Sequence, residues 1–376
     1  MNPPLIASAL LATSLISGAA HAALPSYTFT DLGTLGGAYS KALAINASSQ
    51  VVGYADTTDS IDTAQHATLW NGTTATDLGT LGGTYSTANA INASGQIVGM
   101  SFTTGDVASA TRATLWNGTT ATDLGTPGGE ASHASAINDS GQVVGFSYTT
   151  GLTRHATLWN GTTATDLSTL GGTYSTANAI NASGQIVGWG TTGNGAMHAI
   201  LWNGTTATDL GTLGGGASSY ARAINDSGQV AGSATTGNGA MHATLWNGTT
   251  ATDLGTLGGR ASEAFAINDS GQVVGFSYTT GDATAHATLW DGTTIIDLNS
   301  LLDASAVSAG WVLNFAHSIN DNGWIVGEAS NSILGIHQHA FLLSVTPVPE
   351  ASTYAMMLAG LGLIGAVVMR RKHAKV

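Results

Sequence analysis

A phrase of about 44 residues recurs along this chain, and it limits the fold more than any other feature of the sequence. It contains Asp-Leu-Gly-Thr-Leu-Gly-Gly or a variant, first at Asp31, and the later copies follow at separations of 46, 46, 43, 43, 44 and 44 residues. Seven copies of a second motif, Ile-Asn-x-x-Gly-Gln-Val-Val-Gly or a variant, alternate with these. Such a period indicates that each unit is one supersecondary element that depends on its neighbours for burial.

Each unit contains four runs with the composition of β-strands. In one copy, residues 264–268 lead through Asp-Ser-Gly into residues 272–277, and a third run at 286–290 precedes a Thr-rich run that ends at Asp297-Leu298. The last two runs are joined by two residues, which are Asn-Gly in five units. Asn-Gly is a strong hairpin signal because both residues tolerate positive φ. We therefore expect four-stranded antiparallel units.

The two ends of the repeat region predict how the units close. Adjacent apolar residues such as Val273 and Val274 point to opposite faces of a strand, so both faces of each sheet must be covered. The region opens with a lone fourth strand at residues 27–32, and its last unit supplies only three, ending at residues 339–343. These observations predict a seven-bladed β-propeller closed by pairing the N-terminal strand with the last three strands; an open β-solenoid is the alternative.

Both termini have the composition of targeting segments. Residues 1–22 combine an apolar run with a final Ala-His-Ala, which is typical of a secretory signal peptide. At the other end, the uncharged residues 354–369 predict a transmembrane helix, and the basic residues Arg370, Arg371 and Lys372 after it would stay cytoplasmic. We therefore expect a signal peptide at 1–22, a propeller at 23–346 and a sorting tail at 347–376.

The tail also resembles a known sorting signal. The sequence Val348-Pro349-Glu350, followed by the apolar segment and the basic cluster, is similar to the PEP-CTERM signal. The resemblance implies an exosortase as partner, which would recognise and cleave the tail after membrane delivery. Ala351 stands where that family usually has a second proline, so cleavage is the step that this departure puts in question.

Charge and composition exclude several partners and chemistries. Residues 23–348 contain five basic and 21 acidic residues, a net charge of −16, so no basic patch is available for nucleic acid. The chain has no cysteine, which removes disulfides and thiolate metal sites. We expect no cofactor.

Three residue types recur once in nearly every unit, and we interpret all three as architectural. We expect the histidines to bond a backbone carbonyl across blades, the aspartates to accept backbone N–H groups at a glycine turn, and the tryptophans to pack between blades. No metal site is predicted, because equivalent side chains of neighbouring blades would lie too far apart to share a zinc ion. The positions are His66, His155, His198, His242, His286 and His339; Asp31, Asp77, Asp123, Asp166, Asp209, Asp253 and Asp297; and Trp70, Trp116, Trp159, Trp202, Trp246 and Trp290.

The combined motif, His-Ala-x-Leu-Trp-x-Gly followed by Asp-Leu-Gly-Thr-Leu-Gly-Gly and Ala-x-Ala-Ile-Asn-x-x-Gly-Gln-Val-Val-Gly, resembles the HAF-type extracellular repeat proteins. The resemblance covers nearly all of residues 27–343. It implies an exported repeat protein and supplies no catalytic residue.

The loops between the second and third strands differ most between units, and binding residues tend to lie on such loops. Candidate ligand-face residues there are Asp59, Asp62, Asp106 and Asp282. No catalytic constellation is found. We therefore expect a membrane-delivered protein of the cell surface or extracellular matrix that acts as a non-catalytic binding or structural module for exopolysaccharide or envelope proteins. The alternative is a polysaccharide hydrolase or lyase on a propeller scaffold.

Overall fold

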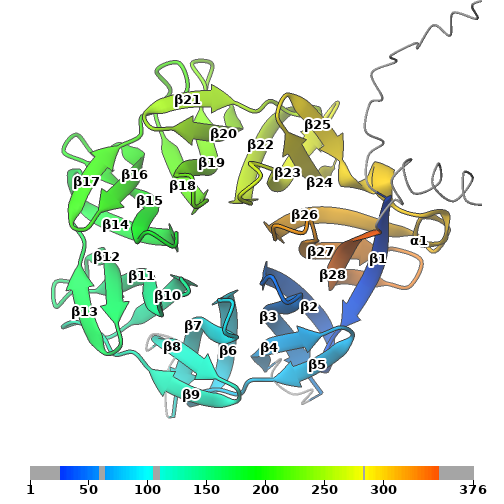
Figure 1. Ribbon diagram of the computed structural model, residues 1–376, viewed down its shortest axis with the longest axis horizontal. Coiled ribbons are helices and arrows are strands. Elements are labelled where there is room, and N and C mark those ends of the chain that lie inside the picture. The colour runs from blue at the N-terminus through cyan, green and yellow to red at the C-terminus, as the bar shows by residue number, and fades with distance from the viewer. Residues whose placement is uncertain (1–25, 59–63, 105–110, 283, 347–376) are drawn as a thin grey trace, which may run out of the picture. The chain divides into compact units, whose positions relative to one another are not determined.

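The computed structural model describes residues 26–58, 64–104, 111–282 and 284–346. Seven four-stranded sheets stand around a centre within one compact unit, Tyr27–Thr346 (Figure 1). The fold is therefore a seven-bladed β-propeller, as the repeat predicts, and not a solenoid. The expected signal peptide at 1–22 and the sorting tail at 347–376 with its helix at 354–369 lie outside the described residues. Within the described ranges, no helix is long and apolar enough to cross a membrane.

Each blade is described here from its innermost strand outward. Blade 1 contains β2 (Gly36–Ile45), β3 (Gln50–Thr57), β4 (Gln65–Asn71) and β5 (Thr74–Asp77); blade 2, β6 (Gly82–Ile91), β7 (Gln96–Thr103), β8 (Thr111–Asn117) and β9 (Thr120–Asp123); blade 3, β10 (Ser132–Ile137), β11 (Gln142–Tyr148), β12 (Arg154–Asn160) and β13 (Thr163–Asp166); blade 4, β14 (Gly171–Ile180), β15 (Gln185–Thr192), β16 (Met197–Asn203) and β17 (Thr206–Asp209). Blade 5 contains β18 (Ser219–Ile224), β19 (Gln229–Thr235), β20 (Met241–Asn247) and β21 (Thr250–Asp253); blade 6, β22 (Gly258–Ile267), β23 (Val273–Thr279), β24 (Ala285–Asp291) and β25 (Thr294–Asp297); blade 7, β26 (Trp311–Ile319), β27 (Ile325–Asn331), β28 (Ile336–Thr346) and β1 (Ser26–Gly33).

Blade 7 closes the ring with strands from both ends of the described chain. The blue strand β1 is the outer neighbour of β28, so the lone opening strand completes the last sheet (Figure 1). The rings of Phe29 and Phe341 lie 6.4 Å apart, and Asp31 accepts a hydrogen bond from Nδ1 of His339 at 3.1 Å. The predicted closure is confirmed.

Adjacent apolar residues on the second strand of each blade pack into different interfaces. Val51 is buried with Trp70 in the cluster between blades 7 and 1, whereas Val52 is buried with Trp116 in the cluster between blades 1 and 2. The same holds in blade 6, where Val273 and Val274 belong to two different clusters. Both faces of each sheet are therefore covered, as the paired valines predict.

The six repeated tryptophans supply the largest buried side chains of these interfaces. Five of them are fully buried and the sixth, Trp290, is 2% exposed. Trp116 of blade 2, for example, packs against Val52, Ala67 and Leu78 of blade 1. Their predicted role in blade packing is confirmed.

A closed circle of amide hydrogen bonds, which we call the asparagine belt, surrounds the centre. The asparagine that follows each innermost strand donates from its Nδ2 to the backbone carbonyl of the equivalent asparagine in the next blade. The bonds are 3.1–3.2 Å long, and the last of them runs from Asn320 back to Asn46. The belt consists of Asn46, Asn92, Asn138, Asn181, Asn225, Asn268 and Asn320.

The innermost strands of four blades begin earlier than the sequence indicates, within the Gly-Gly pair. In blade 1, Leu35 bridges to Thr57, and a Cβ at Gly37 would lie 2.4 Å from Cβ of Asp56. Glycine is required for that close approach. Blade 3 has Pro127 in place of the bridging leucine, and blade 5 contains an extra glycine before β18, so both innermost strands start later.

Two short helices between blades 6 and 7 are absent from the all-strand prediction. The 3₁₀-helix η1 (Leu298–Leu301) is capped by Asp297, and α1 (Ala304–Ser308) is capped by Asp303, whose carboxylate accepts the N–H groups of Ser305 and Ala306. An aspartate at the N-cap satisfies the free N–H groups of a first turn. This capping signal is present in the sequence.

Candidate functional site

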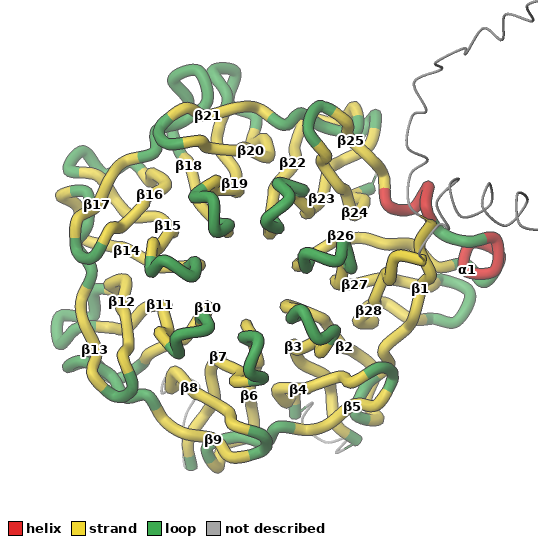
Figure 2. The backbone as a smooth tube through the Cα atoms, in the orientation of Figure 1, coloured by secondary structure: helices red, strands yellow, loops and turns green. Residues whose placement is uncertain are grey.

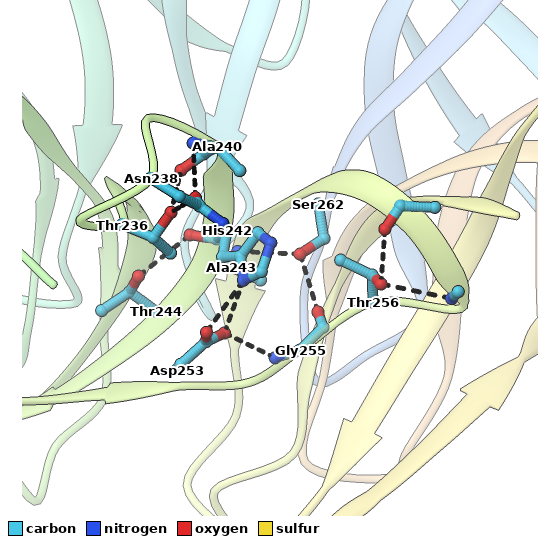
Figure 3. A network of polar contacts seen from close by, with 12 residues as sticks. Thr236, Asn238, Ala240, His242, Ala243, Thr244, Asp253, Gly255, Thr256 and Ser262 are labelled. Carbon is cyan, nitrogen blue, oxygen red and sulfur yellow. Dashed lines mark hydrogen bonds and ion pairs between the residues drawn. The ribbon is translucent and has the colours of Figure 1, made fainter. Parts of the chain in front are cut away.

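The repeated histidines and aspartates form one pair in each of six blades, which we call the His–Asp clasp. In blade 5, Nδ1 of His242 lies 2.8 Å from Asp253, whose other oxygen accepts the N–H of Gly255 at 2.8 Å (Figure 3). Blade 2 has Arg112 and Asp123 instead, 3.6 Å apart. The clasps are His66–Asp77, His155–Asp166, His198–Asp209, His242–Asp253, His286–Asp297 and His339–Asp31.

The clasp corrects one detail of the sequence interpretation. The aspartates accept backbone N–H groups as predicted, but the histidines contact a carboxylate of their own blade and not a backbone carbonyl of the next one. In five of the pairs the histidine precedes the aspartate by eleven residues, a constant spacing that could have identified them.

Other repeated polar groups join neighbouring blades. In Figure 3, the N–H of Ala243 donates to Oγ of Ser262 at 2.9 Å, and that hydroxyl donates to the carbonyl of Gly255 at 2.7 Å. The same Ala-to-Ser bond joins five other blade pairs. The repeated polar residues are thus occupied with one another and with the backbone.

Seven tight turns surround the central opening on one face, where they are green in Figure 2. The opening, about 280 Å³, is lined by the Ile-Asn pairs and the residue after each pair. Four of these next residues are aspartates, and each accepts a backbone N–H of the preceding blade, as Asp139 does from Ala93 at 2.9 Å. Over the described ranges, no group of three or more His, Cys, Asp or Glu side chains could hold a metal ion.

Residues that differ between the blades occur as cross-strand pairs on the two innermost strands. We call these seven the variable pairs: Lys41–Tyr54, Thr87–Met100, His133–Phe146, Thr176–Trp189, Tyr220–Ser233, Glu263–Phe276 and Phe315–Glu328. In blade 1, three other paired positions separate the variable pair from the tight turn. The variable pairs give each blade an individual character beside its repeated residues.

Glu328 of blade 7 has a charged neighbour in blade 1 and a histidine neighbour in its own blade. Nζ of Lys41 lies 3.5 Å from Glu328, and Nε2 of His317 lies 3.6 Å from the same carboxylate. Although burial acts to raise it, the pKa of Glu328 is held below its usual value by these two neighbours. The carboxylate is therefore ionised and paired.

An aromatic and cationic group lies between blades 3 and 4. The His133 ring stacks on Phe146 at 5.2 Å, and the guanidinium of Arg154 lies 5.0 Å from the centre of Phe146 and 4.8 Å from that of Trp189. Burial, with a smaller effect of Arg154, lowers the pKa of His133 to about 4. This histidine is neutral at neutral pH.

Of the four aspartates expected on the ligand face, one is described. Asp282 has a φ of 54°, accepts the N–H of Arg260 at 2.7 Å, and lies 3.4 Å from Nε of the same arginine. It therefore joins a loop to β22. Asp59, Asp62 and Asp106 lie outside the described residues, so the grouping of these four remains a prediction.

The structure adds one cavity that the sequence interpretation missed. It measures about 370 Å³ and is lined by Tyr39, Tyr54, Asp56, Gln65, Tyr85 and Gln338. One signal was available: Asp56 is the only acidic residue at its strand position, where the other blades have Phe102, Tyr148, Thr191, Thr235, Tyr278 and Ser330.

The fold and the tail each have a counterpart among known proteins. The family model for the PEP-CTERM protein-sorting motif matches residues 347–372. No curated protein matches the chain. The β-propeller domain of the Trilobed protease from Pyrococcus furiosus is similar in structure, with a TM-score of 0.55 and 9% identity over 84% of this chain and 95% of that one. A puromycin-hydrolyzing peptidase of Mycobacterium tuberculosis has a TM-score of 0.50 and 11% identity over 82% of this chain and 52% of its own.

At these identities the structural likeness shows the propeller fold alone. The tail match supports the exosortase signal and implies an exported protein that is sorted to the surface on a propeller scaffold.

Proposed function

We propose that this protein is a surface-displayed, non-catalytic binding propeller of the HAF-type extracellular repeat class, which engages exopolysaccharide or an envelope protein. A signal peptide at 1–22 directs export, and the segment at 354–369 holds the chain in the membrane with Arg370, Arg371 and Lys372 on the cytoplasmic side. An exosortase then acts at Val348-Pro349-Glu350 and releases the propeller to the cell surface or matrix.

The observation that carries this proposal is the division between repeated and variable residues. The repeated asparagines, histidines, aspartates and tryptophans are used within and between blades. The variable pairs differ from blade to blade, and so do the loops between the second and third strands, one of which carries Asp282. A repeated scaffold that carries individual residues is what a binding surface on a rigid support requires.

A binding experiment with the whole chain tests this. The chain, purified in a detergent without a sugar head group, is incubated with native exopolysaccharide and with envelope proteins of its host. We expect the parent to bind. The double variant His133→Thr and Phe146→Met, which gives blade 3 the Thr–Met pair of blade 2, should bind at least tenfold more weakly. Ala93→Asp, which copies blade 3 on the opposite face, is the control and should leave binding unchanged. The proposal is abandoned if neither material binds and deletion of the gene leaves the matrix unaltered.

The sorting step has its own test. Replacing Pro349 and Glu350 with alanine should leave the protein uncut and membrane-bound, as seen by immunoblotting of surface and membrane fractions. Equal processing of the variant and the parent would contradict the assignment of Val348-Pro349-Glu350.

A further inference from the structure

We propose that the cavity around Asp56 is a subsite for one neutral pyranose unit of a glycan. This rests on the proposed function and narrows it, because it names the ligand class and the residues that hold it. The volume of about 370 Å³ falls within the range of small-molecule pockets.

Asp56 is a buried carboxylate that lacks a cationic partner. The residue is 6% exposed, and within the described ranges no lysine, arginine or histidine forms an ion pair with it. Burial raises its pKa, opposed by the backbone N–H of Tyr39. A buried carboxylate with so few donors is costly, and two neighbouring hydroxyl groups of a sugar would supply the missing O–H donors.

Two glutamines line the same cavity as this carboxylate. Gln65 is the direct cross-strand partner of Asp56 between β3 and β4. Gln338 reaches in from blade 7 and donates from its Nε2 to Oη of Tyr54 at 3.3 Å. Each amide carries donors and an acceptor, so the set can satisfy hydroxyl groups in both of their roles.

Three tyrosines provide the apolar surface that a pyranose ring needs. Tyr39 is 39% exposed, and Tyr54 and Tyr85 line the same cavity from blades 1 and 2. The C–H faces of a pyranose are apolar, whereas its edge carries hydroxyl groups, and tyrosine offers the matching combination of flat ring and polar tip.

Charge selects a neutral sugar over an acidic one. Asp56 contributes a carboxylate to the wall, and residues 23–348 carry a net charge of −16. A uronate would bring a second carboxylate into this field, which is unfavourable at short range.

The repeat itself supplies variants that the fold accepts. Blades 4 and 5 have Thr191 and Thr235 at the position of Asp56, and blade 5 has Ser233 at the position of Tyr54. Asp56→Thr and Tyr54→Ser therefore remove ligand contacts by changes already present elsewhere in the ring. Tyr278→Thr makes a matched change in blade 6 at the position of Asp56 and serves as the control.

The experiment uses the whole chain in a detergent without a sugar head group. Methyl glycosides of glucose, galactose, mannose and N-acetylglucosamine are compared with methyl glucuronide by saturation-transfer NMR and calorimetry. We expect at least one neutral glycoside to bind and methyl glucuronide to bind at least tenfold more weakly. Asp56→Thr and Tyr54→Ser should each lower affinity for the neutral glycoside at least tenfold, whereas Tyr278→Thr should change it less than twofold.

Three results would overturn the assignment: no binding of any neutral glycoside, tighter binding of the glucuronide, or unchanged affinity in Asp56→Thr. If the parent and Asp56→Thr then capture exopolysaccharide or envelope protein equally well, the subsite is wrong and the proposed binding function stands. If neither captures any material, the proposed function fails as well.

Discussion

The closure of the ring by β1 predicts the behaviour of a circularly permuted chain. In five blades the clasp histidine precedes its aspartate by eleven residues through an Asn-Gly or Asp-Gly turn, but His339 and Asp31 are 308 residues apart. Joining Leu343 through Asn-Gly to Tyr27 restores the spacing of eleven. The permuted chain then starts at Thr34 and ends at Gly33, with blade 7 continuous.

The expected free energies follow from what β1 buries. Tyr27 is 5% exposed and Leu32 is 2% exposed. Burying a large apolar side chain contributes about 1.5–3 kcal/mol, so the two together contribute about 3–6 kcal/mol. Deletion of residues 26–33 removes this burial and leaves β28 as the outer edge of its sheet. We therefore expect the deletion to lower the free energy of unfolding, with the lost burial of the two side chains alone worth about 3–6 kcal/mol.

Urea denaturation of three proteins measures the effect: residues 26–346, the same chain without residues 26–33, and the permuted chain. We expect the permuted chain to match the parent within about 1 kcal/mol, since it keeps residues 27–33 of β1 beside β28 and loses only Ser26 and residues 344–346 to the new connection. A permuted chain as unstable as the deletion would refute the pairing of β1 with β28.

Four other outcomes follow from the structure. Asn320→Ala and Asn181→Ala each remove one link of the asparagine belt, and each should lower the free energy of unfolding by about 1–2 kcal/mol, measured by urea denaturation. An unchanged free energy of unfolding would show that the belt does not stabilise the ring. Trp116→Ala should cost about 3–5 kcal/mol, because the indole is fully buried; a loss below about 1 kcal/mol would contradict its packing role. The pKa of His133 is about 4 in the folded protein, below its ordinary 6.5. Its contribution to the free energy of unfolding is therefore complete above pH 6.5 and is lost as the pH falls toward 4. This loss amounts to at most about 3 kcal/mol, and His133→Thr should make the urea midpoint depend less on pH below 6.5. An unchanged pH dependence in the variant would assign it to another group. Replacing His242 with alanine should cost no more than about 1 kcal/mol by thermal melting, because this clasp is partly exposed; a larger loss would assign it a greater role.

The architecture was predictable because each of its determinants is local or terminal. The paired valines specify two covered faces, the Asn-Gly turns specify hairpins, and the incomplete units at the two ends specify the closing sheet. None of these requires knowledge of which blades are neighbours in space. The helices η1 and α1 break the repeat, because residues 298–308 replace the glycine turn of the other units, and Asp297 and Asp303 signal their starts.

The site was less predictable because its contacts cross between blades. Gln338 and Tyr54 are 284 residues apart in the chain, and their hydrogen bond follows only once the ring is closed and the register of each strand is known. The clasps are different, since in five blades histidine and aspartate lie on adjacent strands at a constant spacing of eleven residues, which makes them predictable.

The repetition that makes the fold predictable from the sequence also limits where a ligand can bind. A residue that is repeated from blade to blade meets the same neighbours each time: asparagine meets a backbone carbonyl, an alanine N–H meets a serine hydroxyl, and the tryptophan ring packs on the next sheet. A residue that breaks the repeat can lack such partners, because its neighbours are those that accommodate a different side chain in the other blades. Asp56 is such a residue, a buried carboxylate at a position where every other blade has an aromatic ring or a hydroxyl. In a repeat protein, the strongest candidates for a binding site are therefore residues that differ between units and lack hydrogen-bond or ion-pair partners of their own.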